Sequence, residues 1–295
     1  MSRAALDLDL VQSALSQQIS RLEGELSTRL LQRSSKGVVP TEAGLAFFRE
    51  AQLTLRHADQ AVRAAQQSRL SGTVSVGLAS TTAVVLGVPL MQAMRARYPD
   101  VRLHLVESMS GHLTGMLNAR QLDLAVLFDT GVARRWSVLP LLEEKLYLMR
   151  PRRVGEADAA ASISMAQLEG VPLILPTGAH GLRSTLDAAF ARVGFKLELV
   201  AEVDSLTMLM DAVCAGLGAT VQPWAALGRV QNAVQCLQWA EITDAQVHRS
   251  NALCSLSDDE LSPAALATRV VLADCARTLV RSGQWAGARL IHHDS

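Results

Sequence analysis

The stretch that decides the fold of the N-terminal region is AALDLDLVQSALSQQISRLEGELSTRLLQRSSKGVVPTEAG, residues 4–44. Its apolar side chains recur at helical spacings of four, three and four, at Leu15, Ile19, Leu22 and Leu26. With Ser13 as the predicted N-cap, this helix covers residues 14–26. A shorter helical pattern over residues 3–10 precedes it. Two helices joined by a tight turn are the arrangement that places a recognition helix in the DNA major groove.

A hairpin and a long helix are expected next. Polar residues and a glycine, Arg33-Ser-Ser-Lys-Gly37, stand between two short apolar runs and suit a hairpin tip. Thr41 is predicted to cap a helix with Glu42 in its first turn, where a negative charge suits the helix dipole. That helix is expected to reach about Arg69, a length of roughly 40 Å. Because its apolar side is too long for the small N-terminal region to cover, we expect a partner helix from a second copy of the chain.

The polar face of the second helix and the basic residues after it are candidates for contacts with duplex DNA. Gln can pair bidentately with adenine, Ser can bond to a base edge or a phosphate, and Arg and Lys can contact phosphates. The candidate contacts are Gln12, Ser13, Ser16, Gln17, Gln18, Arg21, Arg29, Arg33 and Lys36. If the helix or the basic segment is taken alone, the alternative is a solvated amphipathic helix followed by a charged turn. The order of the pieces favours a DNA-binding domain.

Composition sets the limits of these predictions. The 295 residues, 49% hydrophobic and 19% charged, suffice for about two domains. A net charge of zero argues against a protein that coats nucleic acid along its whole surface. No apolar run approaches the ~18 residues of a membrane span, and Asp7 and Asp9 interrupt the N-terminal apolar stretch, so we expect a cytoplasmic protein. The four scattered cysteines are expected to be buried thiols, with a redox switch as the alternative.

After Gly72 strands and helices alternate, which predicts mostly parallel sheets with helices on both faces. The predicted strands cover residues 73–79, 101–107, 122–128, 171–175, 197–203 and 219–222. The predicted helices cover residues 83–98, 111–120, 182–193, 206–216 and 263–280. A crossing strand over residues 141–150 and a return strand over residues 247–256 are expected to divide this region into two lobes.

The sequence thus predicts three regions in an α/β protein. They are two helices followed by a hairpin over residues 1–44, a long helix over residues 41–71, and a two-lobed domain over residues 72–295. Lobe I is expected to comprise about residues 72–143 and 253–285, and lobe II about residues 150–246.

Polar loops follow the predicted strands at their C-terminal ends. Parallel sheets bind ligands at those ends, where helix N-termini present free N–H groups. Hydroxyls and amides there suit a carboxylate or another small polar anion. The candidate effector contacts are Ser80, Thr81, Thr82, Ser108, Met109, Thr130, Thr177, His180, Asp204 and Ser205. For any one of them helix capping is the alternative, because Ser and Thr are common N-caps.

Motifs of known enzymes are missing from the sequence. It contains no GxSxG, HExxH, Walker A or GxGxxG pattern, and its seven histidines fall in no recognisable catalytic motif. The fragment Gly216-Leu-Gly218 follows a predicted helix rather than a strand, so it does not predict a dinucleotide loop. We therefore expect no enzymatic activity, no metal and no cofactor.

Over essentially its whole length the sequence resembles the LysR-type transcriptional regulators, and residues 4–44 carry the most specific part of the resemblance. Gly77–Gln92 and Leu117–Leu127 are similar to the nitrogen assimilation control protein branch of the family. The resemblance implies a winged helix-turn-helix, a linker helix that dimerises, and a two-lobed effector domain like the periplasmic binding proteins. It also implies dimers or tetramers that act at double-stranded promoter DNA.

One departure from the family pattern concerns the N-terminus. Family members have a further helix of about 10–12 residues ahead of the Ala4-Ala5 pair, whereas Met1 lies three residues before Ala4. We expect the start to lie upstream or the chain to be shortened. Without that helix, partial exposure is expected for Ala5, Leu8, Leu15 and Ile19. The alternative function is a stand-alone small-molecule binding protein that has lost DNA binding through truncation.

Overall fold

The computed structural model describes residues 4–5, 11–34, 37–66, 70–128, 136–152, 160–195 and 197–291. The chain forms two compact units, Met1–Gln66 and Gln67–Ser295. We call them the N-terminal unit and the C-terminal unit and describe each by itself.

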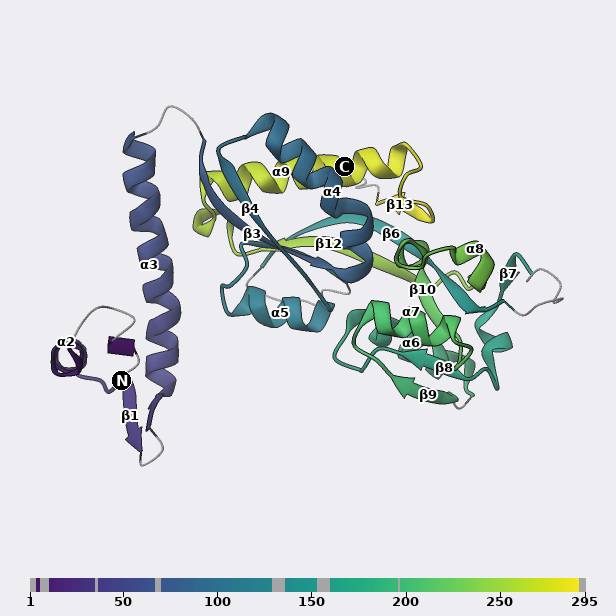
Figure 1. The fold of residues 1–295 in the computed structure, drawn as a ribbon, viewed down its shortest axis with the longest axis horizontal. Helices are drawn as coiled ribbons and strands as arrows, with labels where there is room; N and C mark the ends of the chain where they lie inside the picture. Colours follow the sequence, from purple (N-terminus) through teal and green to yellow (C-terminus); the bar gives the residue numbers. More distant parts are fainter. Residues whose placement is uncertain are drawn as a thin grey trace. The chain divides into compact units, whose positions relative to one another are not determined.

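The N-terminal unit contains a short helix, a hairpin and a long helix (Figure 1). These elements are α2 (Gln12–Glu25), β1 (Leu31–Ser34), β2 (Gly37–Pro40) and α3 (Glu42–Gln66). The strands β1 and β2 pair antiparallel, which confirms the predicted hairpin. The predicted N-cap at Ser13 is wrong. The extended backbone ends at Val11, so α2 begins one residue before Ser13, and no side chain among the described residues caps it.

Hydrogen bonds to the segment between α2 and α3 hold the N-terminal unit together. The carboxylate of Glu23 accepts from the backbone N–H groups of Leu30 and Leu31 at 2.8 and 2.9 Å. The Thr41 hydroxyl accepts from the Gly44 N–H at 2.9 Å, which confirms the predicted cap of α3. A Cβ on Gly44 would lie 2.0 Å from the Leu30 carbonyl oxygen, so this close approach requires glycine.

The expected exposure of the apolar side chains is only partly found. Ala5 is 2% exposed, so the expectation of exposure at this position is wrong. Leu15 and Ile19 on α2 are half-buried, as expected. Leu8 lies outside the described residues.

The C-terminal unit alternates strands and helices as predicted. Its strands are β3 (Gly72–Ala79), β4 (Val101–Ser108), β5 (Leu124–Phe128), β6 (Ser137–Pro151), β7 (Ser162–Ile163), β8 (Leu173–Leu175), β9 (Leu199–Glu202), β10 (Thr220–Pro223), β11 (Leu237–Ile242), β12 (His248–Ser255) and β13 (Ala288–Leu290). Its helices are α4 (Ser80–Arg97), α5 (Ser110–Asn118), α6 (Gly181–Val193), α7 (Leu206–Cys214), α8 (Ala233–Cys236) and α9 (Pro263–Arg281), with short 3-10 turns η1 (Met165–Leu168), η2 (Trp224–Arg229) and η3 (Asp258–Glu260).

The long strand β6 joins two groups of elements (Figure 1). The described strands of the main sheet lie in the order β4-β3-β5-β12-β6-β11-β7, with β10 and β13 also paired to β6. The β3–β4 and β3–β5 pairs are parallel, as predicted, but the crossing strands β6 and β12 pair antiparallel with each other and with their neighbours. The expectation of parallel pairing therefore holds for the β3–β4 and β3–β5 pairs and for the separate β8–β9 pair.

Separate hydrophobic cores define two lobes. In lobe I, α4 and α9 pack with β3 and β5 around a core that includes the buried Trp285. In lobe II, α6 packs with β8 and β10 in one core, and α7 packs with β6 and η2 in another.

Two further findings concern membranes and thiols. Within the described residues, no helix is both long and apolar enough to cross a membrane. The four cysteines are free thiols, but only Cys254 is buried, so the expectation of burial holds for this residue and is wrong for Cys214, Cys236 and Cys275, which are half-buried. Burial raises the pKa of Cys254 to about 12, which leaves this thiol protonated and unreactive at neutral pH.

Candidate functional site

A small cavity lies between the two lobes of the C-terminal unit. Its volume is about 30 Å³, which is room for roughly one water molecule. Ligand pockets for small molecules usually enclose about 300 Å³ or more. The cavity is lined by Ala79, Ser80, Thr81, Met109, Ser110, Phe128, Pro176, His180, Leu182, Val203, Leu206, Leu209, Gln222 and Arg249. The lobes are therefore closed against each other in this structure.

Four described helices begin at the wall of this cavity. The helix α4 and the helix α5 start there in lobe I, and α6 and α7 start there in lobe II. Each contributes its first residue or its N-cap to the lining, namely Ser80, Ser110, His180 and Leu206. A helix N-terminus carries about half a positive elementary charge and unpaired N–H groups. Each of these helix ends favours negative charge at the cavity.

A buried ion pair places Arg249 in the wall of the cavity. Arg249 is 2% exposed and lies beside Glu144, which is 1% exposed, on the paired strands β12 and β6. The Arg249 guanidinium donates to Glu144 at 3.0 Å and to the Thr81 hydroxyl at 2.8 Å. Asn251 and Trp285 also donate to Glu144, at 2.8 and 2.9 Å. The carboxylate is thus fully satisfied inside the protein, as a buried charge must be.

The guanidinium also stacks on an aromatic ring. Its Cζ atom lies 3.7 Å from the centroid of the Phe128 ring. This cation–π contact fixes the plane of Arg249 next to the cavity.

The structure distributes the predicted effector residues over different environments. Ser80, Thr81, Met109 and His180 line the cavity. Thr82 is completely buried, and within the described residues its hydroxyl has no hydrogen-bond partner. Ser108 ends β4 and is half-buried, away from the lining. Ser205 caps α7 by accepting from the Met208 N–H at 3.3 Å, which is the capping alternative. Thr130 lies outside the described residues.

Thr177 and Asp204 bind each other behind His180. The backbone N–H and the hydroxyl of Thr177 donate to Asp204 at 2.9 and 2.8 Å. Burial raises the pKa of Asp204, but these bonds and the neighbouring His180 outweigh burial and lower the pKa below its usual value. The His180 Nε2 atom lies 3.1 Å from the Asp204 carboxylate without the alignment of a hydrogen bond. Asp204 therefore stays ionised at neutral pH, beside the His180 ring.

Sequence reasoning missed several residues of the cavity. Ser110, Phe128, Gln222 and Arg249 line it but were not among the candidates. Arg249 and Gln222 lie inside strands rather than in the loops at strand ends where ligands of parallel sheets are expected. The strand β12 reads His-Arg-Ser-Asn-Ala-Leu-Cys-Ser, so Arg249 stands among other polar residues and no local pattern marks it.

The candidate DNA contacts lie in the N-terminal unit. On α2 and just after it, Gln12, Ser13, Gln17, Gln18, Arg21 and Arg29 are exposed, and Ser16 is half-buried. Arg21 donates to Glu25 at 3.0 Å, an exposed pair within one helix. Arg33 belongs to β1, but its side chain lies outside what the structure describes, and so does Lys36.

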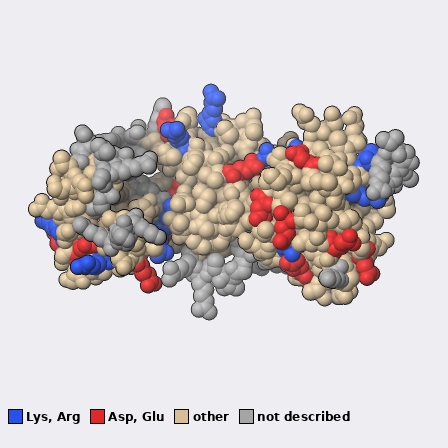
Figure 2. All heavy atoms as spheres, turned by 60° about the horizontal axis from the view of Figure 1, so that its bottom comes forward, with Lys and Arg blue, Asp and Glu red and all other residues tan. Residues whose placement is uncertain are grey.

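Charge on the C-terminal unit is uneven. Figure 2 shows Asp and Glu side chains gathered on the part of its surface towards lobe II. Exposed acids of lobe II include Glu169, Asp187, Glu198, Glu202 and Asp204. A surface of this sign repels the phosphate backbone.

Comparison with known proteins agrees with this architecture. The family model "LysR substrate binding domain" matches residues 67–276, and "Bacterial regulatory helix-turn-helix protein, lysR family" matches residues 1–45. The nitrogen assimilation regulatory protein nac of Klebsiella aerogenes is 35% identical over 277 residues, which span 92% of this chain and 88% of that relative.

Solved structures show the same fold. A full-length single-residue variant of OxyR from Pseudomonas aeruginosa has a TM-score of 0.74 at 23% identity, and the match covers 100% of this chain and 93% of that one. Full-length CbnR complexed with its target DNA has a TM-score of 0.66 at 20% identity, and the match covers 93% of each chain.

These matches define the class of protein. The chain belongs to the LysR family of bacterial transcriptional regulators. It is a DNA-binding regulator with a helix-turn-helix domain and an effector-binding domain of the periplasmic-binding-protein type. CbnR is itself a LysR family transcriptional regulator, and its structure was solved in complex with its target DNA. The alternative of a stand-alone binding protein is not favoured, because the helix-turn-helix model matches the N-terminal residues.

Proposed function

We propose that this regulator binds promoter DNA through the exposed face of α2 and that a small anion bound between the two lobes controls it. The observation that carries the effector proposal is the start of four helices at one cavity, beside the buried Arg249. The proposed action is binding without catalysis, in the cytoplasm where the promoter lies. The proposed division of the chain keeps residues 1–44 as the DNA-binding domain, 41–71 as the linker and 72–295 as the effector domain.

The DNA contacts are proposed for two groups of residues. The side chains of α2 that are exposed or half-exposed, Gln12 to Arg21, form the surface that enters the major groove. Arg29, Arg33 and Lys36 are proposed to contact phosphates, which positions the domain without reading sequence.

A substitution of Gln17 separates base recognition from phosphate binding. In Gln17→Ala, loss of a bidentate base contact is expected to weaken binding to the promoter site by about 1–3 kcal/mol, or roughly tenfold to 100-fold. Binding to unrelated DNA is expected to stay the same. In Arg29→Ala both affinities are expected to fall together, with a shallower dependence on salt. Titration of labelled duplexes at several salt concentrations measures both. Equal loss on both duplexes in Gln17→Ala would remove this residue from base recognition.

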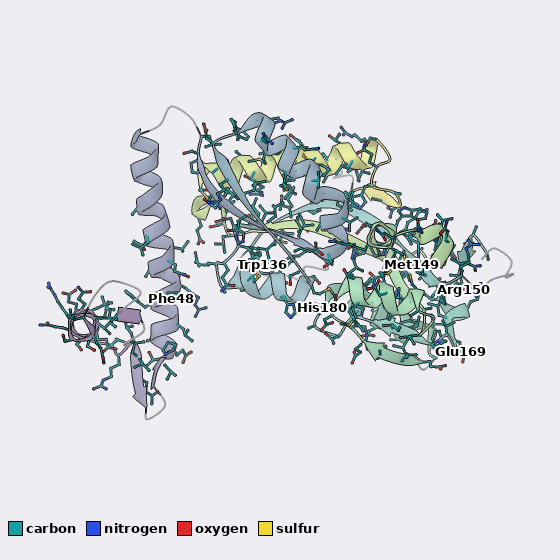
Figure 3. All side chains as sticks on the ribbon, in the orientation of Figure 1. Phe48, Trp136, Met149, Arg150, Glu169 and His180 are labelled. Atoms are coloured by element: carbon teal, nitrogen blue, oxygen red, sulfur yellow. The ribbon has the colours of Figure 1, made fainter. Side chains whose placement is uncertain are left out.

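A second copy of the chain is the proposed partner of α3. This helix leaves Leu45, Phe48 and Leu55 exposed, at 50%, 57% and 68% (Figure 3 labels Phe48). Such large apolar side chains along one helix are the pattern of a helix that packs against another helix. We therefore propose that the linker forms the dimer contact, in a dimer or a tetramer.

The chemistry of the effector follows from the cavity. Helix N-termini favour negative charge, and the hydroxyls of Ser80 and Thr81 donate hydrogen bonds to acceptor oxygens. Arg249 already has its counter-charge in Glu144, so the attraction comes mainly from the helix ends. A small carboxylate or a similar oxyanion fits these donors. Because the closed cavity holds about 30 Å³, the lobes must part to admit it.

A thermal-shift experiment on the full chain tests the anion proposal. At least one member of a panel of small carboxylates is expected to raise the unfolding temperature by a few degrees, as expected for a ligand well above its Kd. The matched primary amides are expected to have no effect. In Ser80→Asp the new carboxylate suits the start of α4 but repels the anion, so the rise is expected to disappear. Ser262→Asp, at the N-cap of α9 away from the cavity, is the matched control. Equal stabilisation by acids and amides would contradict the proposal.

A further inference from the structure

Two helices meet end to end across the junction of the lobes. The first residue of α5 in lobe I is Ser110, and the N-cap of α6 in lobe II is His180. The Gly181 N–H at the start of α6 donates to the Ser110 hydroxyl at 3.2 Å. The Gly111 N–H at the start of α5 donates to His180 Nδ1 at 3.2 Å. Each helix thus supplies the acceptor for an N–H of the other helix.

These two hydrogen bonds offset the electrostatic repulsion between the two helix N-termini. Two helix N-termini carry partial positive charge of the same sign and repel each other when they meet. Their N–H groups also need acceptors, since a buried N–H without one costs about 1–3 kcal/mol. Ser110 and His180 are 6% and 2% exposed, so water does not replace them. The two cross-lobe bonds are therefore what makes the contact between the helix ends favourable.

The imidazole of His180 is held in the orientation that the bond needs. Because Nδ1 accepts from Gly111, the proton of the neutral ring lies on Nε2, which faces Asp204. Asp204 is fixed in turn by two hydrogen bonds from Thr177. His112 on α5 meets the ring edge-on, with centroids 5.5 Å apart. Figure 3 shows His180 beside α5, at the border of the two lobes.

The backbones approach so closely that only glycine fits. A Cβ on Gly111 would lie 2.4 Å from the Ala179 carbonyl oxygen of lobe II. A Cβ on Gly181 would lie 2.8 Å from the Phe128 carbonyl oxygen of lobe I. Contacts with backbone atoms at these distances are not relieved by a change of rotamer. An ion pair between the lobes, Arg229 with Glu107, is partly exposed and contributes less to lobe closure than the buried contacts.

We propose that Ser110 and His180 form a latch that holds the two lobes closed when no effector is bound. In the latch, His180 is a positioning residue for lobe closure and not a ligand of the effector. Opening breaks the two cross-lobe bonds and leaves the Gly111 and Gly181 N–H groups free. The latch accounts for a closed cleft whose cavity has room for only about one water molecule.

A steric wedge tests the latch without removing any hydrogen-bonding group. In Gly111→Ala, the added methyl group is expected to push the Ala179 carbonyl away and separate the helix ends. Amide hydrogen exchange on the ligand-free full chain, followed by mass spectrometry of peptides, is expected to show about tenfold or faster exchange at the start of α6. Gly115→Ala on the same helix, where a Cβ meets nothing within 4 Å, is expected to match the original protein. Unchanged exchange at the start of α6 in Gly111→Ala would overturn the proposal.

Variants of the acceptors keep the test decisive if the wedge disturbs folding. Ser110→Ala removes only the acceptor of Gly181 and is expected to speed exchange at the start of α6. Ser184→Ala, which removes an exposed hydroxyl from the same region of α6, is the control. His180→Leu is expected to speed exchange at the start of α5, and His180→Gln, whose amide can both accept and donate, is expected to restore protection. Equal exchange in His180→Leu and His180→Gln would show a packing role only and would overturn the latch. Because no effector is added, this outcome does not depend on the anion proposal.

Discussion

Replacing Glu144 by alanine is expected to lower the free energy of unfolding of the C-terminal unit by about 3–5 kcal/mol. The substitution leaves the Arg249 guanidinium buried without its counter-charge. It also leaves the Asn251 and Trp285 donors without their acceptor, because both donate to this carboxylate. The four tryptophans of the sequence lie at positions 136, 224, 239 and 285, so fluorescence during urea unfolding reports on the C-terminal unit.

The neighbouring Glu143 provides the matched control. It pairs with Arg289, which is 75% exposed, so Glu143→Ala is expected to cost less than about 1 kcal/mol. A double variant, Glu144→Leu with Arg249→Met, removes both charges and is expected to recover much of the loss. If Glu144→Ala unfolded at the same urea concentration as the original protein, the buried pair would have no structural role.

Substitution of Gly44 by alanine is expected to abolish most DNA binding and to leave the C-terminal unit intact. The new methyl group would lie 2.0 Å from the Leu30 carbonyl oxygen, which also accepts from the Thr41 N–H at 2.9 Å. Relief requires that the start of α3 move away from the segment that carries the hairpin. Overpacking of this kind costs about 1–3 kcal/mol or more, so affinity for the promoter is expected to fall at least about tenfold.

Two measurements check this prediction. Titration of a promoter duplex gives the affinity, and tryptophan fluorescence gives the stability of the C-terminal unit in the same sample. Gly24→Ala is the control, because a Cβ at this position of α2 meets nothing within 4 Å. Equal affinity of Gly44→Ala and Gly24→Ala would show that the close approach at Leu30 is not needed for DNA binding.

Periodicity in the sequence predicted most of the fold, and the errors have local causes. The helix α4 begins at Ser80, three residues before the predicted start at Ala83, because Ser-Thr-Thr has low intrinsic helix propensity and tertiary packing outweighs it. Two buried residues of that run, Thr81 and Thr82, pack inside the protein as part of the first turn. The two-residue strand β7 is too short to leave a pattern. The strand β11 reads Leu-Gln-Trp-Ala-Glu-Ile, in which polar and apolar residues do not alternate strictly and Gln238 is buried, so its polarity pattern did not reveal it.

Residues that only strand register or the packing of the lobes brings together could not be predicted from the sequence as parts of one site. The polar loops at strand ends were found because topology alone brings them together. Glu144 and Arg249 are 105 positions apart, and only the register of β6 with β12 sets them side by side. The close approach of Ala179 to Gly111 likewise depends on how the lobes meet, which no local pattern encodes.

The strand β6 has a further consequence for how this protein can be divided. Its first part pairs with β12 and its last part pairs with β10 and β11, so a single strand supplies backbone partners to both lobes. Lobe I is built from segments on both sides of lobe II in the chain. A fragment cut to contain lobe II alone would leave part of β6 with one edge bare, and a fragment of lobe I would require a new join. A fragment that keeps every backbone partner of β6 must therefore contain both lobes.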